Sequence, residues 1–259
     1  MRSVISFAAA AMLAAAIILS VPAAISAKEW KTVRIGTEGA YPPFNNVDAS
    51  GKLVGFDIDI ANALCAEMKV KCTFVAQDWD GIIPGLLAKK YDAIVASMTI
   101  TDERKQRVDF TEKYYTTPVQ FIVSKGSGLK VTPAGLKGKT VGAQKATVSA
   151  NYLTDNYKGA TLKFYDTQEQ VNLDMKAGRL DAMLQDKLIM VDWMKENGAK
   201  YEFAGPVMTD PKWFGDGIGI AVRKGDKDLT AMLNKAIKAI VANGTYAKIN
   251  EKYFPFSIY

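Results

Sequence analysis

Short apolar runs rich in β-branched residues alternate with segments of helical periodicity along most of the chain. The first half predicts strands at 32–36, 72–76 and 92–96, and helices at 57–69 and 81–89. The second half repeats this order, with strands at 140–143, 162–165 and 181–184 and helices at 147–156, 168–176 and 187–196. Such alternation indicates βαβ units with parallel strands and right-handed crossovers.

Two extended segments, 118–123 and 217–222, lie between and after these units, and we expect them to cross between two lobes. Helices at 227–243 and 246–253 then return the chain to the first lobe. The predicted fold class is therefore α/β, with two lobes, each a mostly parallel sheet flanked by helices, and two crossing strands as the hinge. Two crossings restrict the lobes to a hinge motion that opens and closes a cleft.

The predicted boundaries follow from this arrangement. Residues 28–117 form the first part of lobe one, residues 118–218 form lobe two, and residues 219–259 return to lobe one.

The two halves share an internal echo. Asp92-Ala93 and Asp181-Ala182 begin equivalent strands, and Ser97 and Asp186 each follow the aspartate by five residues. Open α/β sheets bind ligands at the carboxyl ends of their strands. One polar side chain from each lobe is thus expected at the cleft, unless the two Asp-Ala pairs coincide by chance.

The segment 97–104, Ser-Met-Thr-Ile-Thr-Asp-Glu-Arg, follows the apolar strand at 92–96. A guanidinium such as that of Arg104 suits a planar carboxylate, and hydroxyl oxygens such as that of Thr99 accept from an ammonium. The segment therefore predicts a receptor for the backbone of a free amino acid. A surface arginine at the start of a polar helix is the alternative.

The first 27 residues have the three regions of a secretory signal peptide. Arg2 precedes an Ala-rich apolar run from Ile5 to Val21, and small residues follow as far as Ala27. We expect cleavage near Ala27 and export of the remaining chain. A membrane anchor is the competing interpretation, because the run approaches the roughly 20 residues that span a bilayer.

Charge and composition exclude several functions. Removal of Arg2 with the signal lowers the formal charge from +6 to +5, and basic residues are scattered among acidic ones. This pattern is typical of a solvated surface and not of a nucleic-acid-binding face. The chain has no histidine, and it has no phosphate loop or nucleophile elbow. No cofactor, metal site or catalytic residue is predicted.

Cys65 and Cys72 are the only cysteines, with six residues between them. An exported protein meets an oxidising environment, so we expect a disulfide that joins the helix at 57–69 to the strand at 72–76. A structural zinc site is excluded, because two thiols without a histidine do not supply four ligands.

Several motifs in order resemble the periplasmic polar amino-acid-binding proteins of ABC importers, solute-binding protein family 3. The resemblance is strongest to the lysine/arginine/ornithine- and histidine-binding branch. It implies the periplasmic binding protein fold, a periplasmic location, a monomer, an amino-acid ligand and an inner-membrane ABC permease as partner. The motifs are IGTEGAYPPF at 35–44, GFDIDI at 55–60, DAI at 92–94, ITDER at 100–104, GRLDA at 178–182 and FGDG at 214–217.

The resemblance also implies roles for individual residues at the ligand backbone. Arg104 would clasp the carboxylate, and Ser97 and the start of the segment Ala146-Thr147 would add donors. Asp186, from the other lobe, would accept from the ammonium together with Thr99. As a simpler alternative or additional role, Asp186 is suited to cap a helix.

Three residues are implied at the ligand side chain. Tyr41 and Trp79 would enclose it and Glu38 would meet its far end, whereas ordinary packing is the alternative for the two aromatic residues. Met98, between Ser97 and Thr99, completes the predicted set. The chain departs from the family at Glu38, where aspartate is frequent, and at Lys145-Ala146-Thr147, where Gly-Ser/Thr-Thr is common.

These residues favour a cationic ligand. A cationic stem between aromatic faces gains roughly 0.5–2 kcal/mol, and a buried carboxylate needs a charged partner. Arginine, ornithine and lysine are ranked first and histidine next, and an arginine-derived opine is an alternative. A cyclohexadienyl dehydratase-like enzyme and a sensor domain on the same fold are further alternatives. The enzyme is disfavoured because a substrate with two carboxylates fits poorly beside Glu38 and Asp186.

Overall fold

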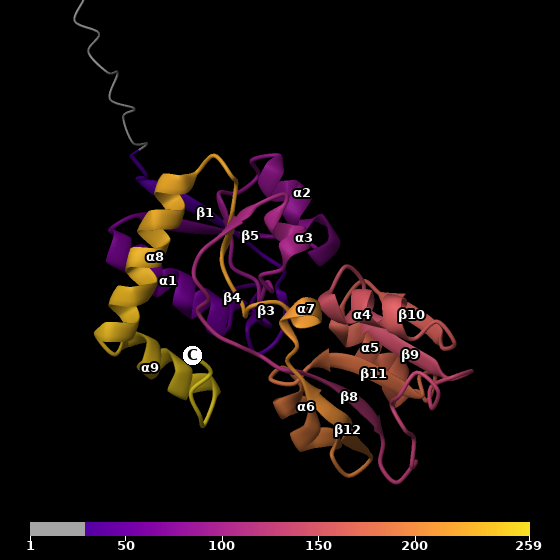
Figure 1. Ribbon diagram of the computed structural model, residues 1–259. Helices are drawn as coiled ribbons and strands as arrows, with labels where there is room; N and C mark the ends of the chain where they lie inside the picture. Colours follow the sequence, from indigo (N-terminus) through magenta and orange to yellow (C-terminus); the bar gives the residue numbers. More distant parts are fainter. Residues whose placement is uncertain (1–28) are drawn as a thin grey trace, which may run out of the picture.

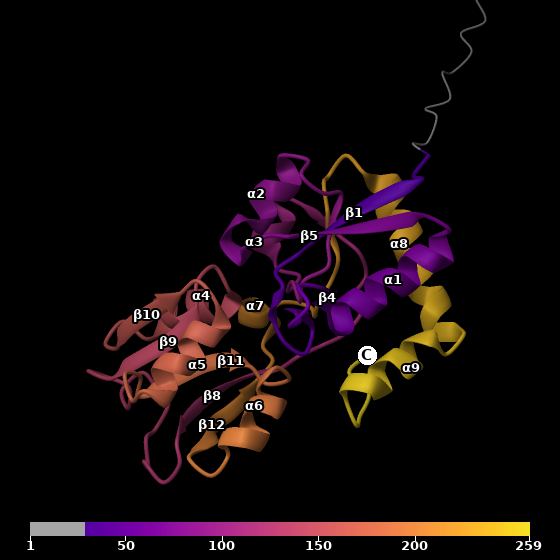
Figure 2. The same ribbon diagram turned by 180° about the vertical axis from the view of Figure 1, so that it is seen from behind.

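The computed structural model describes residues 29–259, and these residues form two lobes joined by two chain segments (Figures 1 and 2). The predicted signal peptide lies outside the described residues. Each lobe contains a five-stranded sheet with helices against it. The two-lobed α/β prediction is confirmed, but both sheets are mixed: each combines parallel and antiparallel neighbours.

In lobe one the strand order is β5-β1-β6-β13-β7. The strands are β1 (Thr32–Thr37), β5 (Lys71–Ala76), β6 (Ala93–Ile94), β7 (Asp109–Phe110) and β13 (Ala221–Val222). A small second sheet contains β2 (Ala40–Tyr41), β3 (Asn45–Val47) and β4 (Leu53–Val54). The helices are α1 (Phe56–Met68), the 3₁₀ turn η1 (Trp79–Gly81), α2 (Ile82–Leu87), α3 (Asp102–Lys105), α8 (Lys227–Ala242) and α9 (Thr245–Tyr253).

In lobe two the strand order is β10-β9-β11-β8-β12. The strands are β8 (Val119–Ser124), β9 (Thr140–Gln144), β10 (Thr161–Tyr165), β11 (Ala182–Asp186) and β12 (Tyr201–Met208). The helices are α4 (Val148–Asn156), α5 (Gln168–Lys176), α6 (Met190–Asn197) and α7 (Pro211–Phe214). Strand β12 and the small sheet of lobe one were not predicted.

The first predicted crossing segment lies almost entirely in a sheet, and the second lies in one only at its last two residues. Residues 119–124 form β8, which is almost entirely buried and pairs antiparallel with both β11 and β12. Residues 221–222 form β13, which pairs with β6 and β7 of lobe one. The crossings are adjacent, because Tyr115 and Ile218 form an antiparallel bridge. The buried backbone N–H and C=O groups of an apolar segment need hydrogen-bond partners, and pairing inside a sheet supplies them.

The sequence echo has a structural cause. In lobe one the Asp92 carboxylate accepts from the backbone N–H of Arg34 at 3.0 Å, and in lobe two Asp181 accepts from that of Thr140 at 2.8 Å. Each aspartate thus fixes its strand beside the parallel neighbour, β1 or β9. Equivalent strands therefore deliver Ser97 and Asp186 at the carboxyl edges of the two sheets.

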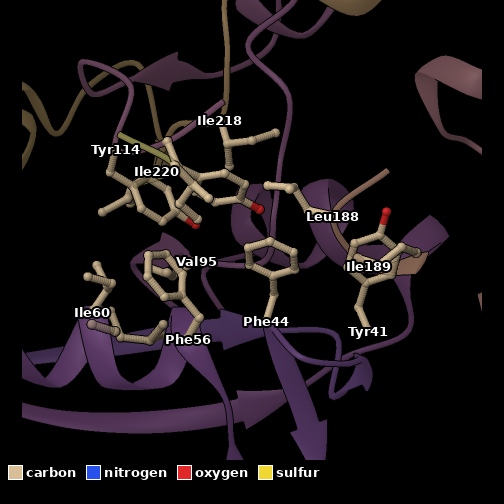
Figure 3. Packing of buried hydrophobic residues seen from close by; sticks show 14 of the residues in the cluster. Tyr41, Phe44, Phe56, Ile60, Val95, Tyr114, Leu188, Ile189, Ile218 and Ile220 are labelled. Atoms are coloured by element: carbon tan, nitrogen blue, oxygen red, sulfur yellow. The ribbon is translucent and has the colours of Figure 1, made fainter. Parts of the chain in front are cut away.

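Aromatic rings fill much of the core of lobe one (Figure 3). Phe44 stacks on Tyr115 with centroids 4.8 Å apart, and Phe56 meets the same ring edge-on at 5.7 Å. Phe56 begins α1, whose buried positions Ile60 and Leu64 recur at helical spacing. Figure 3 also shows Tyr41 beside Leu188 and Ile189 of lobe two, so this packing reaches across the lobe boundary.

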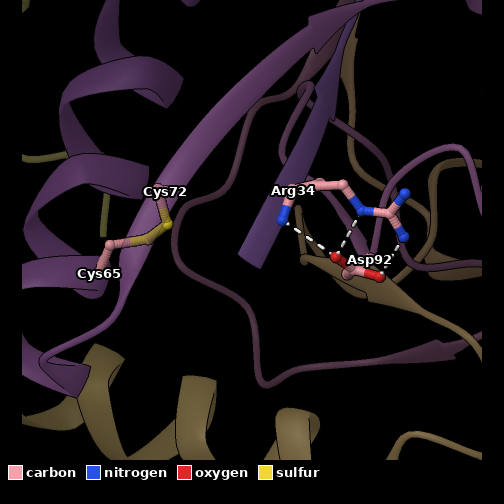
Figure 4. Close-up of a disulfide and its surroundings, with 4 residues drawn as sticks. All are labelled: Arg34, Cys65, Cys72 and Asp92. Carbon is pink, nitrogen blue, oxygen red and sulfur yellow. Dashed lines mark hydrogen bonds and ion pairs between the residues drawn. A yellow bond between two sulfur atoms is a disulfide. The ribbon is translucent and has the colours of Figure 1, made fainter. Parts of the chain in front are cut away.

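The disulfide prediction is confirmed: Cys65 of α1 is bonded to Cys72 of β5 (Figure 4). The bridge joins the end of the helix to the edge strand of lobe one, across the left-handed turn at Lys69. Within residues 29–259, no helix has the length and apolar character needed to cross a membrane.

Candidate ligand-binding site between the lobes

Polar side chains from both lobes converge on a small cavity of about 20 Å³ at the carboxyl ends of the strands. All the predicted site residues except Met98 line this cavity. The lining residues are Glu38, Tyr41, Trp79, Ala96, Ser97, Thr99 and Arg104 from lobe one and Gln144, Thr147, Val148, Ser149, Gln185 and Asp186 from lobe two. A larger open groove of about 670 Å³ adjoins it and shares Trp79, Arg104 and Val148 with it.

Asp186 ends strand β11 and meets Tyr41 across the cleft. The Tyr41 hydroxyl donates to Asp186 Oδ2 at 2.8 Å and lies 3.1 Å from Gln185 Oε1. Burial raises the pKa of Asp186 to about 6, although the Tyr41 hydrogen bond and the charge of Arg104 oppose the shift. A ligand cation beside Asp186 would stabilise the ionised form of this buried carboxyl group and would receive a hydrogen-bond acceptor in return.

Arg104 is held at the mouth of the cavity by a local turn. Thr101 caps the short helix α3 by accepting from the Arg104 backbone N–H. The guanidinium donates to the carbonyls of Thr99 at 2.9 Å and Ala146 at 3.2 Å, and it lies 5.3 Å from the centre of the Trp79 ring. Burial lowers its pKa to about 10, so the group is a cation at neutral pH.

The start of α4 faces Arg104 from lobe two. Thr147 is the N-cap: its hydroxyl accepts from the Ala150 N–H at 3.2 Å and donates to the Gln144 carbonyl at 2.7 Å. The N–H groups of Val148 and Ser149 belong to the first helical turn, where no intrahelical acceptor exists. A helix N-terminus beside an arginine is suited to an anion such as a carboxylate.

Glu38 lies at another wall of the cavity and contacts Gln144 of lobe two. Gln144 Nε2 donates to Glu38 Oε1 at 2.6 Å. Burial raises the pKa of Glu38 to about 7, against the effect of the Gln144 hydrogen bond. The cavity thus contains two buried carboxyl groups and one guanidinium.

Trp79 and Tyr41 both border the cavity and both bridge the lobes. Trp79 Nε1 donates to the Ala146 carbonyl at 3.0 Å, while Tyr41 donates to Asp186. Both rings are buried. Packing and cavity lining are therefore not alternatives for these residues, because each ring does both.

Three residues of the segment 97–99 differ in their surroundings. The Ser97 hydroxyl donates to Asp57 at 3.0 Å, so its hydrogen is directed away from the cavity. Met98 is fully buried and packs in the same cluster as Trp79. Thr99 lines the cavity, and its carbonyl holds Arg104.

Sequence reasoning missed five lining residues: Ala96, Gln144, Val148, Ser149 and Gln185. Gln185 precedes Asp186, and its Oε1 accepts from the Asp186 N–H at 2.7 Å. Gln144 ends β9, the neighbour of β11. For Gln144 and Gln185 a signal was present: each is a polar residue at the carboxyl end of an apolar strand, where the same reasoning places Asp186.

A further contact closes the cleft at its edge. Lys145 Nζ lies 2.7 Å from Asp80 Oδ2 of lobe one and 2.6 Å from Asp166 Oδ1 of its own lobe. The Lys145–Asp80 ion pair holds the lobes against each other, together with the contacts of Tyr41, Trp79, Arg104 and Gln144.

A two-lobed α/β protein with a polar site between its lobes is the architecture of a solute-binding protein. Residues 33–256 match the model of the bacterial extracellular solute-binding proteins, family 3. The chain belongs to this family.

Relatives of known name support this assignment. The chain is 49% identical over 233 residues to the L-arginine-binding protein of Pseudomonas aeruginosa, covering 88% of this chain and 90% of that protein. It is 45% identical over 233 residues to the lysine/arginine/ornithine-binding periplasmic protein of Escherichia coli, with the same coverage.

Solved structures agree. A Salmonella typhimurium periplasmic binding protein described as having high arginine specificity superposes with a TM-score of 0.80 at 38% identity, covering 86% of this chain and 99% of that one. An ancestral amino acid-binding protein, described as a precursor of cyclohexadienyl dehydratase, gives 0.77 at 34% identity, covering 86% and 96%.

Proposed function

We propose that this protein captures a free cationic amino acid between its lobes in the periplasm and delivers it to the permease of an ABC importer. One observation carries the choice of ligand: the cavity is lined by two buried carboxyl groups, Glu38 and Asp186, and by one guanidinium, Arg104. An amino acid with a cationic side chain has two positive groups and one negative group. Its charges are complementary to those of the cavity, so no buried ion is left unpaired.

Each group of the ligand has a partner of opposite character. The carboxylate would lie between Arg104 and the N-terminal turn of α4, where Thr147 is the cap. The ammonium would replace the Tyr41 hydroxyl at Asp186, with Thr99 as a second acceptor. The cationic end of the side chain would lie against Glu38, with Tyr41 and Trp79 beside its apolar stem.

The predicted domain boundaries fit this mechanism as part of the proposal. Lobe one (28–117 and 219–259) would contribute Arg104 and Glu38, and lobe two (118–218) would contribute Asp186 and Thr147. Hinge bending near the Tyr115–Ile218 bridge would admit the ligand, because the cavity between the closed lobes is too small to take it up directly. A monomer is sufficient, since one chain supplies every group.

We propose binding and not catalysis. The named relatives are binding proteins. A dicarboxylate substrate of the dehydratase class would bring two further negative charges to Glu38 and Asp186, with Arg104 as their only cationic partner among the lining residues. The opine alternative is not favoured, because its added carboxylate would also meet this acidic cavity.

A thermal-shift panel of the twenty amino acids, ornithine, an arginine-derived opine and prephenate tests the proposal. A ligand at a hundredfold excess over its dissociation constant stabilises the folded state by about 2.7 kcal/mol. Arginine, ornithine or lysine should raise the melting temperature most. A larger shift with glutamate, glutamine or prephenate, or turnover of prephenate, would contradict it.

A further inference from the structure

Gln144 is a buried residue from lobe two that touches the acidic end of the cavity. It ends β9, is 1% exposed, and forms two hydrogen bonds through Nε2. One goes to Glu38 Oε1 of lobe one at 2.6 Å, and the other goes to the Asp166 carbonyl of its own lobe at 3.0 Å. Its position is therefore fixed from both lobes.

The two neighbours also fix the orientation of the amide. Carboxyl and carbonyl oxygens both accept, so the amide nitrogen must face them and the amide oxygen must face elsewhere. Among the described residues no side-chain donor bonds to Gln144 Oε1 or to Glu38 Oε2. One acceptor from each lobe thus remains without a partner, and both residues line the cavity.

We propose that Gln144 is a specificity-determining residue that favours a guanidinium over an ammonium at the far end of the ligand. The inference rests on the proposed binding of a cationic amino acid. A guanidinium is planar, and its five N–H groups point in fixed directions, so it needs acceptors beyond a single carboxylate oxygen. An ammonium is a compact charge whose three donors rotate, so Glu38 Oε2 alone provides its principal partner.

The geometry links the two acceptors. Because Gln144 Nε2 occupies Glu38 Oε1, the carboxylate offers one oxygen and the amide offers the next. A planar guanidinium at the end of a side chain that extends past Glu38 would contact both the carboxylate oxygen and the amide oxygen. Removal of the amide oxygen would leave some N–H groups of the guanidinium buried and unpaired, whereas an ammonium would still pair with the Glu38 carboxylate.

The experiment compares arginine and lysine by calorimetry in the parent and in Gln144→Met, which keeps side-chain length and removes both the amide oxygen and the N–H donor to Glu38. Affinity for arginine should fall about tenfold to a hundredfold, the effect of losing a hydrogen bond to a charged group. Affinity for lysine should change less than about threefold. The matched control is Gln120→Met, another buried glutamine of the same sheet, which bonds to the Gly205 carbonyl and lies outside the cavity lining; it should leave the arginine-to-lysine ratio unchanged.

Equal losses for arginine and lysine in Gln144→Met would overturn the proposal, because a residue that only holds the lobes together affects both ligands alike. A parent protein that binds the two ligands equally would overturn it as well, and that result needs no variant to fold. A parent that binds neither ligand would instead contradict the proposed function, so the two failures are distinguishable.

Discussion

At the residue scale, the site depends on ionisable groups whose pKa values are shifted by burial. Burial raises the pKa of Glu38 and Asp186 and lowers that of Arg104. Each of these groups gains from a partner of opposite charge, and the three do not balance one another within the protein. The imbalance is what makes a cationic ligand complementary to the cavity.

Arg104→Ala should abolish useful binding. Loss of one partner of a desolvated charge pair costs about 2–5 kcal/mol, or roughly 30-fold to several thousandfold in the dissociation constant. Calorimetry measures the affinity, and the melting temperature without ligand shows that the fold persists. The control is Arg107→Ala, an exposed arginine that lines only the outer groove. An affinity within threefold of the parent in Arg104→Ala would refute the carboxylate-binding role.

Glu38 makes binding depend on pH. Its pKa is about 7 without ligand, and a cationic side chain requires the ionised form, so arginine should bind more weakly as the pH falls from 8 to 6. The stability of the free protein should change with pH in the opposite direction. A raised carboxyl pKa contributes stability that is fully present below the ordinary value of 4.5 and is lost as the pH rises through about 7.

The matched variant for this pH effect is Glu38→Gln. This variant should weaken arginine binding by roughly 1.5–3 kcal/mol and glutamine binding much less. It should also flatten the pH dependence of arginine binding between pH 8 and 6. Asp186, with a pKa of about 6, should still weaken binding below that pH. An unchanged pH profile in the variant would assign the titration to another group.

At the element scale, the sequence was most informative where packing repeats a simple pattern. Helix α1 places Phe56, Ile60 and Leu64 on one buried face, and the predicted range differs from the observed one by a single residue at each end. Strand β6 was predicted over five residues but extends over two, and the chain turns three residues later at Ser97, whose φ is 52°. A local turn of this kind has no hydrophobic signature.

Contacts between elements distant in sequence were harder to predict. Strand β12 pairs with β8 across about eighty residues and has an irregular register near Ala204 and Met208, so its alternation is weak. Most of the predicted site residues lie close together because they are at or just after the carboxyl ends of neighbouring strands. Gln144 ends a strand in the same way, but its contact with Glu38, 106 residues away in the other lobe, is not visible in the sequence.

The disulfide between α1 and β5 should stabilise lobe one without affecting the site. For a loop of this length the chain-entropy model gives about 2–3 kcal/mol, which corresponds to a melting temperature lower by roughly 5–10 °C in the Cys65→Ser, Cys72→Ser double variant. Arginine affinity should stay within about threefold, because neither cysteine lines the cavity. A large loss of affinity at a temperature where the variant is folded would show that α1 is coupled to the site.

At the scale of the whole molecule, the lobes are held closed by a few contacts whose removal should speed ligand release. Most of these contacts involve groups that would also touch the ligand. Lys145 is one exception: it lies at the edge of the cleft, is partly exposed, and joins Asp80 of lobe one to Asp166 of lobe two. The Asn151–Glu103 and Lys105–Asp216 contacts are others. Lys145 therefore allows closure to be tested separately from recognition.

Asp80→Ala should raise the dissociation rate of arginine by up to about fivefold at low salt, because an exposed pair contributes no more than about 1 kcal/mol. The difference from the parent should shrink at high salt, where such charges are screened. The control is Asp166→Ala, which removes a Lys145 partner within lobe two and leaves the bond between lobes in place. Stopped-flow dissociation measures both variants. If Asp166→Ala accelerates release as much as Asp80→Ala, Lys145 acts by shaping its own turn at Ala146 and Thr147 and not by joining the lobes.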